Sequence, residues 1–273
     1  MPRMYSRLYT PPPPLSALVN CFWYSEGFEG THQQERLLPN GESGIVFDLR
    51  EAPIQIYGDG GTIESFEPAI FCGSRTDCFI IDTCAQERVI GVQFRPGGAY
   101  PFLAMPACEV ANATHSLEDL WPRQAKDLRD ALLNARGVEA MFATLEKTLL
   151  RRLRDSARLH PAVTFAIRIL ARPGDGVRVR DVADKAGFST RRLSDLFEQQ
   201  TGLAPKAFQR VRRFQHALRS LHTGNEEQWA SLAATCGYYD QAHFIHDFRS
   251  FSGMTPSEYL AVATPHLNHV PLA

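Results

Sequence analysis

A pattern of two short helices separated by a glycine occurs twice in the C-terminal part of the sequence, and it constrains the fold more than any other feature. The matched pairs are Gly187 and Gly237, Leu193 and Phe244, Phe197 and Phe248, Gly202 and Gly253, Pro205 and Pro256, and Phe208 and Tyr259. The first pair is 50 positions apart and the others are 51 apart, so the second turn holds one extra residue. A short helix, a glycine-containing turn and a second helix form a helix-turn-helix. The repeat therefore predicts two helix-turn-helix units in tandem.

Local signals define the second helix of each unit. Ser189 and Asp240 stand where an N-cap side chain would accept a hydrogen bond from a free amide of the first turn. Apolar residues then recur at helical spacing and predict the buried face; they are Leu193, Leu196 and Phe197 in the first unit and Phe244, Phe248 and Phe251 in the second. One such pair of helices would suit any helical domain. Its repetition, with Gly-x-x-Pro after each copy, favours the helix-turn-helix interpretation.

Residues 160–262 resemble the DNA-binding domain of the AraC/XylS family of bacterial transcription regulators. The resemblance is carried by the repeated motif and by a long helix predicted over 205–222, which would join the units and fix their separation. It implies that each second helix enters a major groove of double-stranded DNA with its N-terminal side chains on base edges. The base-reading positions that it implies are Arg191, Ser194 and Asp195 in the first unit and Gln241, Ala242, His243 and His246 in the second.

The chemistry of these side chains suits bases. Arginine pairs with guanine, glutamine with adenine, a carboxylate accepts from cytosine N4, and an alanine methyl contacts the thymine methyl. Asp195 departs from the family, in which a longer or basic residue is common, so it either reads cytosine or only repels phosphate. The candidate phosphate contacts, which position the protein without specifying sequence, are Arg192, Lys206, Arg210 and Arg249.

Charge divides the chain unequally. Residues 1–150 carry 12 basic and 19 acidic residues, whereas residues 151–273 carry 17 and 11. An acidic first part and a basic second part are typical of a protein in which only one domain contacts nucleic acid. We therefore predict a β-rich effector-sensing domain over 1–122, a helical linker or dimerisation region over 123–159, the DNA-binding domain over 160–262 and a tail over 263–273.

The N-terminal domain reads as antiparallel β structure. Short apolar runs at 45–49, 54–57, 69–72, 78–81 and 89–94 alternate with turn clusters, a pattern typical of a sandwich or barrel. The AraC/XylS resemblance implies a cupin-like barrel here. Residues 93–103 and 117–121 also resemble an uncharacterised domain that precedes such DNA-binding domains. The predicted fold class is thus α+β: mostly antiparallel β with helices, followed by an all-α tandem helix-turn-helix domain.

Sites for small molecules are less marked in this domain. Its histidines are His32 and His115, too few for a clustered metal site, and Cys72, Cys78 and Cys84 lack a ligand spacing. We expect no metal and no cofactor. Trp23 and Tyr24 are candidates to line an apolar pocket, although an aromatic core would use them equally well. Arg95 precedes a Pro-Gly-Gly turn that could bind an anion or could simply connect a strand to a helix.

The region over 123–156 has helical periodicity with Gly137 as a break. Its apolar faces could make dimer contacts or pack on the N-terminal domain.

Taken together, the sequence predicts a sequence-specific transcription regulator and no enzymatic activity. Its expected partner is an operator in double-stranded DNA, with a small-molecule effector, RNA polymerase and a second copy of the chain as further candidates. No signal peptide and no apolar run of membrane-spanning length is found, so we expect a cytoplasmic protein. The alternative is a DNA-repair alkyl-transfer enzyme fused to the same DNA-binding module, which would need tightly spaced cysteines for zinc.

Overall fold

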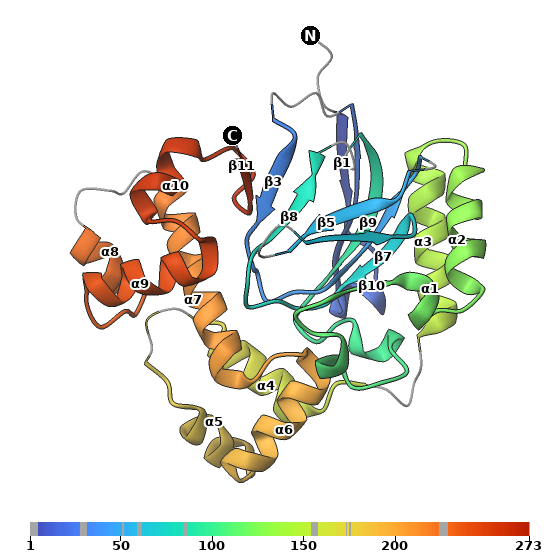
Figure 1. Cartoon of the computed structure of the whole chain (residues 1–273). Coiled ribbons are helices and arrows are strands. Elements are labelled where there is room, and N and C mark those ends of the chain that lie inside the picture. The colour runs from blue at the N-terminus through green and yellow to red at the C-terminus, as the bar shows by residue number, and fades with distance from the viewer. Residues whose placement is uncertain are drawn as a thin grey trace.

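The computed structural model describes residues 5–27, 32–50, 52–58, 62–83, 87–153, 158–172, 174, 176–223 and 229–272. A β-rich domain with helices on one side is followed by a helical domain, and the C-terminal residues return to the β-rich domain (Figure 1). This arrangement confirms the predicted fold class.

Two antiparallel sheets form the N-terminal domain. The six-stranded sheet has the order β1-β2-β9-β4-β7-β10 and the five-stranded sheet has the order β11-β3-β8-β5-β6. The first sheet consists of β1 (Tyr5–Tyr9), β2 (Val19–Glu26), β9 (Arg88–Phe94), β4 (Gly44–Asp48), β7 (Ala69–Cys72) and β10 (Thr114–Ser116). The second consists of β11 (His269–Leu272), β3 (Gln34–Leu37), β8 (Phe79–Asp82), β5 (Ile54–Tyr57) and β6 (Ile63–Phe66).

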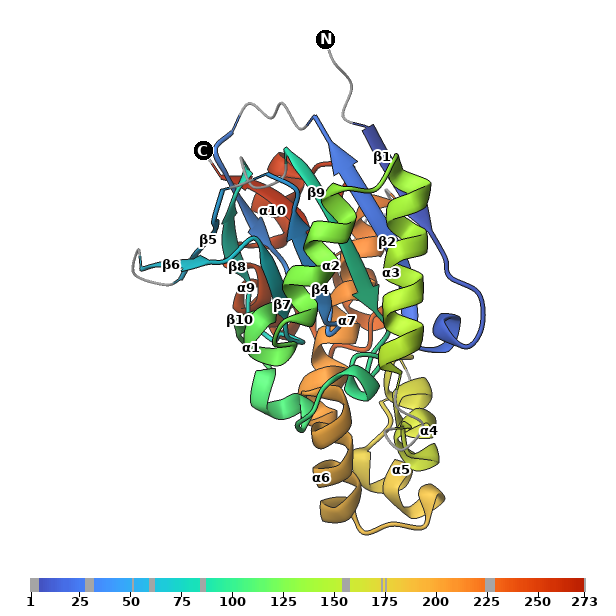
Figure 2. The ribbon, with the colours of Figure 1, turned by 90° about the vertical axis from the view of Figure 1, so that its right-hand side faces the viewer.

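Helices cover the outer face of the six-stranded sheet (Figure 2). They are α1 (Leu117–Leu120), α2 (Gln124–Leu133) and α3 (Val138–Arg152). Alternate residues of a strand point to opposite faces, so Ile45 and Phe47 join the core beneath these helices, whereas Val46 packs between the sheets. The apolar faces of α2 and α3 are buried in the same core. Of the two roles considered for these faces, the structure therefore shows packing on the N-terminal domain.

Short 3-10 helices complete the domain. They are η1 (Leu15–Ala17), η4 (Tyr100–Phe102) and η5 (Ala107–Val110). The last of these lies against the helical domain.

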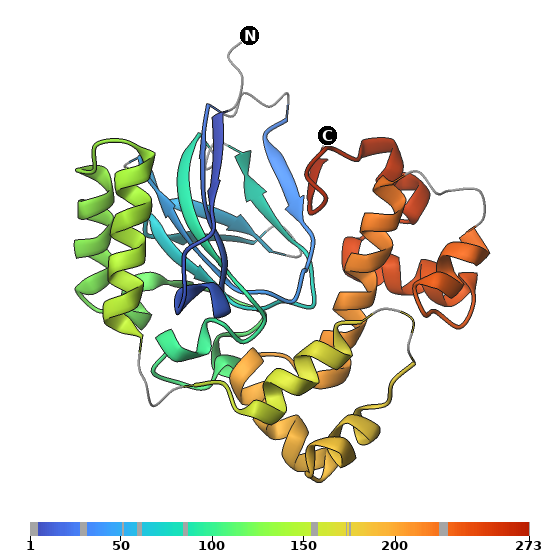
Figure 3. The same ribbon diagram turned by 180° about the vertical axis from the view of Figure 1, so that it is seen from behind.

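The C-terminal domain contains both predicted helix-turn-helix units and the long helix predicted over 205–222. It consists of α4 (Pro161–Leu170), α5 (Val179–Ala186), α6 (Thr190–Thr201), α7 (Pro205–His222), α8 (Trp229–Thr235), α9 (Gln241–Ser252) and α10 (Pro256–Val262). From behind, α7 runs between the two helix-turn-helix units, α5 with α6 and α8 with α9 (Figure 3). Its apolar stripe is buried along its whole length and joins the cores of both units.

The residues after α10 add a strand to the N-terminal domain. Within the segment predicted as a tail, β11 pairs antiparallel with β3 and lies beside it in Figure 1. The hydroxyl of Tyr259 in α10 donates to the main-chain oxygen of Leu267, and burial raises the pKa of Tyr259 to about 12. The helical domain is thus attached to the sheet by its own C-terminal residues.

Candidate nucleic-acid interface and domain cavity

The first unit is built by local signals that the sequence displays. Gly187 ends α5 with a φ of +75°, in the left-handed region that glycine adopts readily. Ser189 caps α6, since its Oγ accepts from the amide of Arg192 at 3.2 Å. Leu193 and Phe197 are fully buried, which fixes the rotation of α6. Arg191 and Asp195 consequently lie exposed on the outer face, with Ser194 partly buried between them.

The second unit repeats this construction. Gly237 follows α8 with a φ of +77°, and the Asp240 carboxylate caps α9 by accepting from the amide of His243 at 2.7 Å. Phe244 and Phe248 are fully buried. The N-terminal turn of α9 therefore presents Gln241 and Ala242 to solvent. The caps predicted for both units are confirmed, and so are the buried stripes, except that Leu196 of the first unit is only partly buried.

A buried carboxylate fixes α9 against α7, and sequence analysis did not identify it. Asp247 accepts from Arg210 at 2.7 Å and lies 3.4 Å from a guanidinium nitrogen of Arg213, although only 4% of its side chain is exposed. His243 Nε2 lies 3.8 Å away from the same carboxylate. Burial and this carboxylate also raise the pKa of Tyr238. The signal was available: Asp247 falls between buried phenylalanines, where a carboxylate needs a cation.

The two recognition helices end in the same way, and the N-terminal domain contacts both ends. Thr201 and Ser252 occupy equivalent positions, and each hydroxyl donates to the carbonyl four residues earlier. The main-chain oxygen of Thr201 accepts from Ser74 Oγ at 2.9 Å, and that of Ser252 accepts from Arg36 Nη1 at 3.1 Å. Both donors belong to the N-terminal domain. It therefore bridges the two units at matched points of the repeat.

The predicted base-reading residues are arranged in two groups, one at each recognition helix. Arg191, Asp195, Gln241, Ala242 and His246 are exposed, so the N-terminal domain does not cover them. The His243 ring is already engaged, because its Nδ1 accepts from the amide of Tyr239 at 3.4 Å. Base contact by any of these residues stays a prediction.

The residues predicted to contact phosphate differ in exposure and in whether they already have a partner. Arg192, Lys206 and Arg249 are exposed. Arg210 is paired with Asp247 and also lies over the Phe251 ring at 5.1 Å. Its first role in the fold is therefore to hold α9, and phosphate contact by Arg210 would have to use the part of the guanidinium that remains exposed.

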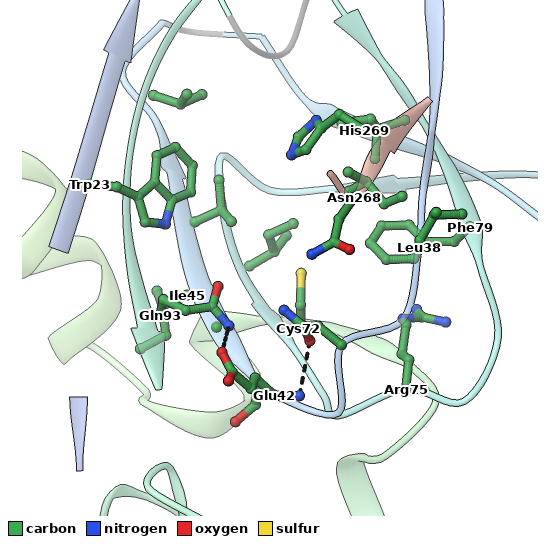
Figure 4. Close-up of a pocket in the computed structure, with 18 of the residues that line it drawn as sticks. Trp23, Leu38, Glu42, Ile45, Cys72, Arg75, Phe79, Gln93, Asn268 and His269 are labelled. Atoms are coloured by element: carbon green, nitrogen blue, oxygen red, sulfur yellow. Dashed lines mark hydrogen bonds between the residues drawn. The ribbon is translucent and has the colours of Figure 1, made fainter. Parts of the chain in front are cut away.

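A cavity of about 480 Å³ lies between the two sheets of the N-terminal domain. Trp23 points into it (Figure 4), and its indole lies flat on β9 because Gly91 opposite has no Cβ; a Cβ there would come within 2.4 Å of the ring. Tyr24 also lines the cavity, but its ring is buried in the core beneath the helices. Arg95 is not a lining residue, and its Nε donates to the main-chain oxygen of Ser16 at 2.9 Å. Ligand binding by these three residues stays a prediction.

Comparison with known proteins gives a separate match for each of the two domains. Residues 182–261 match the model of a helix-turn-helix domain, and residues 7–116 match a domain of unknown function, DUF6597. The transcriptional activator RhaR of Yersinia pseudotuberculosis is 37% identical over 79 residues, which cover 29% of this chain and 27% of the relative. The arabinose operon regulatory protein of Escherichia coli is 27% identical over 157 residues, 53% of each chain. The chain thus spans between a quarter and about half of these relatives.

Among solved structures, an AraC-type transcriptional regulator from Chromobacterium violaceum is similar. It is 26% identical, with a TM-score of 0.36, and covers 39% of this chain and 96% of that chain.

The duplicated fold and the comparisons define the class of the C-terminal domain: it is a tandem helix-turn-helix domain. More particularly, it is a DNA-binding domain of the AraC type, joined to an N-terminal domain of unknown function. These comparisons give no support for the repair-enzyme alternative.

The described residues lack two further features. Within them, no three histidine, cysteine or acidic side chains come together as metal ligands would. No described helix combines the length and apolar character needed to cross a bilayer. Cys84, part of the regular cysteine spacing, lies outside the described residues.

Proposed function

We propose that this chain is a sequence-specific transcription regulator that acts by binding an operator and performs no chemistry. In this proposal α6 and α9 enter successive major-groove segments about 34 Å apart, one turn of the duplex. The observation that carries it is the repeated, N-capped recognition helix with exposed Arg191 and Asp195 in one copy and Gln241 and Ala242 in the other. The activator and operon-regulator names of the relatives support the same reading.

Selection of bound sequences from random duplexes with the purified full chain would test the proposal. The expected result is two short conserved elements separated by about one helical turn. Recovery of sequences without a shared element, although binding is tight, would contradict sequence-specific recognition.

Gln241 provides a sharper test within the selected site. Gln241→Ala should weaken binding by about 1–3 kcal/mol at one base pair, because a glutamine amide forms a bidentate pair with adenine. Arg249→Ala is the matched control, since loss of a phosphate contact should weaken binding to all sequences equally. Affinities are compared on duplexes substituted at each position in turn. Equal weakening on every duplex by Gln241→Ala would remove this residue from the base-reading set.

We further propose that the N-terminal domain regulates DNA binding, either through a small effector or through a second copy of the chain. The cavity supports the first route. The edge position of β1, whose residues are all exposed, supports the second. Contact with RNA polymerase and action in the cytoplasm belong to the same proposal.

A further inference from the structure

The cavity of the N-terminal domain is apolar in its body. Ile54, Ile56 and Ile70 form a small separate core between the sheets, with Phe79 and Ile81 packed against it. All of these residues also line the cavity. A space of about 480 Å³ with such walls is of the size in which small organic ligands are bound.

The helical domain contributes one side of this cavity. Residues 266–269, which follow α10, are among those that line it. The main-chain oxygen of Asn268 accepts from the Leu38 amide at 2.9 Å, and β11 continues from there along β3. His269 Nδ1 lies 2.8 Å from the carboxylate of Glu35, which is buried in β3. The cavity is therefore complete only while the C-terminal strand is in place.

Asn268 connects the cavity directly to α7. Gln215 in α7 is buried, and its Nε2 donates to the main-chain oxygen of Pro39 at 2.8 Å and to Asn268 Oδ1 at 2.7 Å. Because Gln215 must donate to both, the Asn268 amide turns its oxygen toward α7. The amide nitrogen then lies toward Trp23 in the view of Figure 4.

Among the described residues, the lining includes polar atoms without a partner, among them the buried Ser25 Oγ and Arg75 Nε. Within the described part of the chain, no residue accepts from the indole N–H of Trp23 or from the amide nitrogen of Asn268, whereas the Glu42 carboxylate already accepts from Gln93 and Arg212. The lining charges are likewise paired within the protein: Glu42 with Arg212, and Arg75 with Asp77 at 3.9 Å. An occupant that satisfies such a lining carries acceptor oxygens and no net charge.

We propose that the cavity binds an uncharged, largely apolar molecule with carbonyl or hydroxyl oxygens, and that the C-terminal strand β11 forms part of this binding site. The occupant accepts from Trp23 and Asn268. Since Asn268 is also bonded to Gln215 in α7, an occupied cavity holds the helical domain against the sheets. Any effect of occupancy on DNA binding rests on the function proposed above, whereas the binding site itself does not.

A titration of the full chain with Nile red, an uncharged apolar dye that carries a carbonyl oxygen, tests the site. We expect saturable one-to-one binding with a blue shift of emission.

Asn268→Ala should weaken dye binding about tenfold, because one buried hydrogen bond is lost. The matched control is Leu272→Ala on the same strand, outside the lining, which should leave the affinity unchanged. Cys72→Phe, which places a ring where the Cys72 sulfur points into the cavity, should abolish binding. Circular dichroism and thermal midpoints verify that each variant folds.

Three results would overturn the proposal. The first is equal dye affinity of Asn268→Ala and the unaltered folded chain. The second is tighter binding of an anionic dye such as anilinonaphthalene sulfonate at the same Cys72→Phe-sensitive site. The third is the absence of slower hydrogen exchange in residues 266–272 when Nile red saturates the site. Duplex binding, measured on the same samples, separates the two proposals: dye binding without DNA binding defeats the proposed function, and DNA binding without dye binding defeats the cavity proposal.

Discussion

Asp247 is the residue on which the position of the second recognition helix depends most. Its carboxylate is buried against two partly exposed arginines of α7, so removing it deprives both guanidinium groups of an acceptor and α9 of its link to α7. Asp247→Ala should lower the free energy of unfolding by about 3–5 kcal/mol, the range for breaking a buried ion pair. Asp195→Ala, at an exposed position of the first recognition helix, should change it by less than about 0.5 kcal/mol. Denaturant unfolding of both variants is the measurement, and similar small losses would contradict this role of Asp247.

Glu42 should give the domain contact a pH dependence. Burial raises the pKa of the Glu42 carboxyl above its ordinary 4.5, although Arg212 opposes the shift. The folded chain then binds this proton more tightly than the unfolded chain, so the Glu42 contribution to stability falls as pH rises from about 4.5 through the raised pKa. Glu42→Gln should remove this decline. Unfolding free energies of both proteins between about pH 4.5 and 7 would show it, and parallel curves would exclude it.

At the scale of elements, two glycines that end helices are required for different reasons. One is needed for its backbone conformation alone, and the other also for close contact between the domains. Gly187 and Gly202 both have a positive φ, of +75° and +87°. A Cβ on Gly187 would meet nothing within 4 Å, whereas a Cβ on Gly202 would lie 2.4 Å from Ser74 Oγ and 3.1 Å from the Ala107 carbonyl. Gly187→Ala should therefore cost about 1 kcal/mol for backbone strain alone. Gly202→Ala should cost clearly more, because it also separates α6 from the N-terminal domain. Equal losses in thermal or denaturant unfolding would show that this contact contributes nothing.

Elements whose signals are local were predictable, and those that depend on distant partners were not. The second helix of each unit and α7 follow from caps, helix-ending glycines and apolar spacing that lie within a few residues of each other. In contrast, β11 is a strand only because β3 offers its edge, and residue 269 is more than two hundred positions from its partner Leu37. Likewise, exposure of Arg210 could be expected from the pattern of α7. Its pairing with Asp247 could not, since that pairing requires α9 to cross α7 at this point.

The whole molecule joins its two domains at both ends of the repeat. Ser74 contacts the end of α6 and Arg36 contacts the end of α9, at positions that the duplication makes equivalent. Two recognition helices read successive grooves only if their separation matches the turn of the duplex. Here that separation is set by α7 and also by the N-terminal domain, through a contact at each unit. In the function proposed above, a change in the N-terminal domain would alter DNA binding through these two contacts, without contacting DNA.

Charge distribution over the whole molecule makes a prediction about salt. Only the C-terminal part is basic. The number of counterions released on DNA binding should therefore depend on basic residues of the helical domain alone. The slope of log K against log salt concentration is negative. Arg192→Ala and Arg249→Ala should each reduce its magnitude by about 1, with little change in base preference. Arg136→Ala, exposed between α2 and α3, is the matched control and should leave the slope unaltered. An equal reduction of the slope by Arg136→Ala would mean that the N-terminal domain also contacts the phosphates. The proposal that only the helical domain contacts DNA would then be wrong.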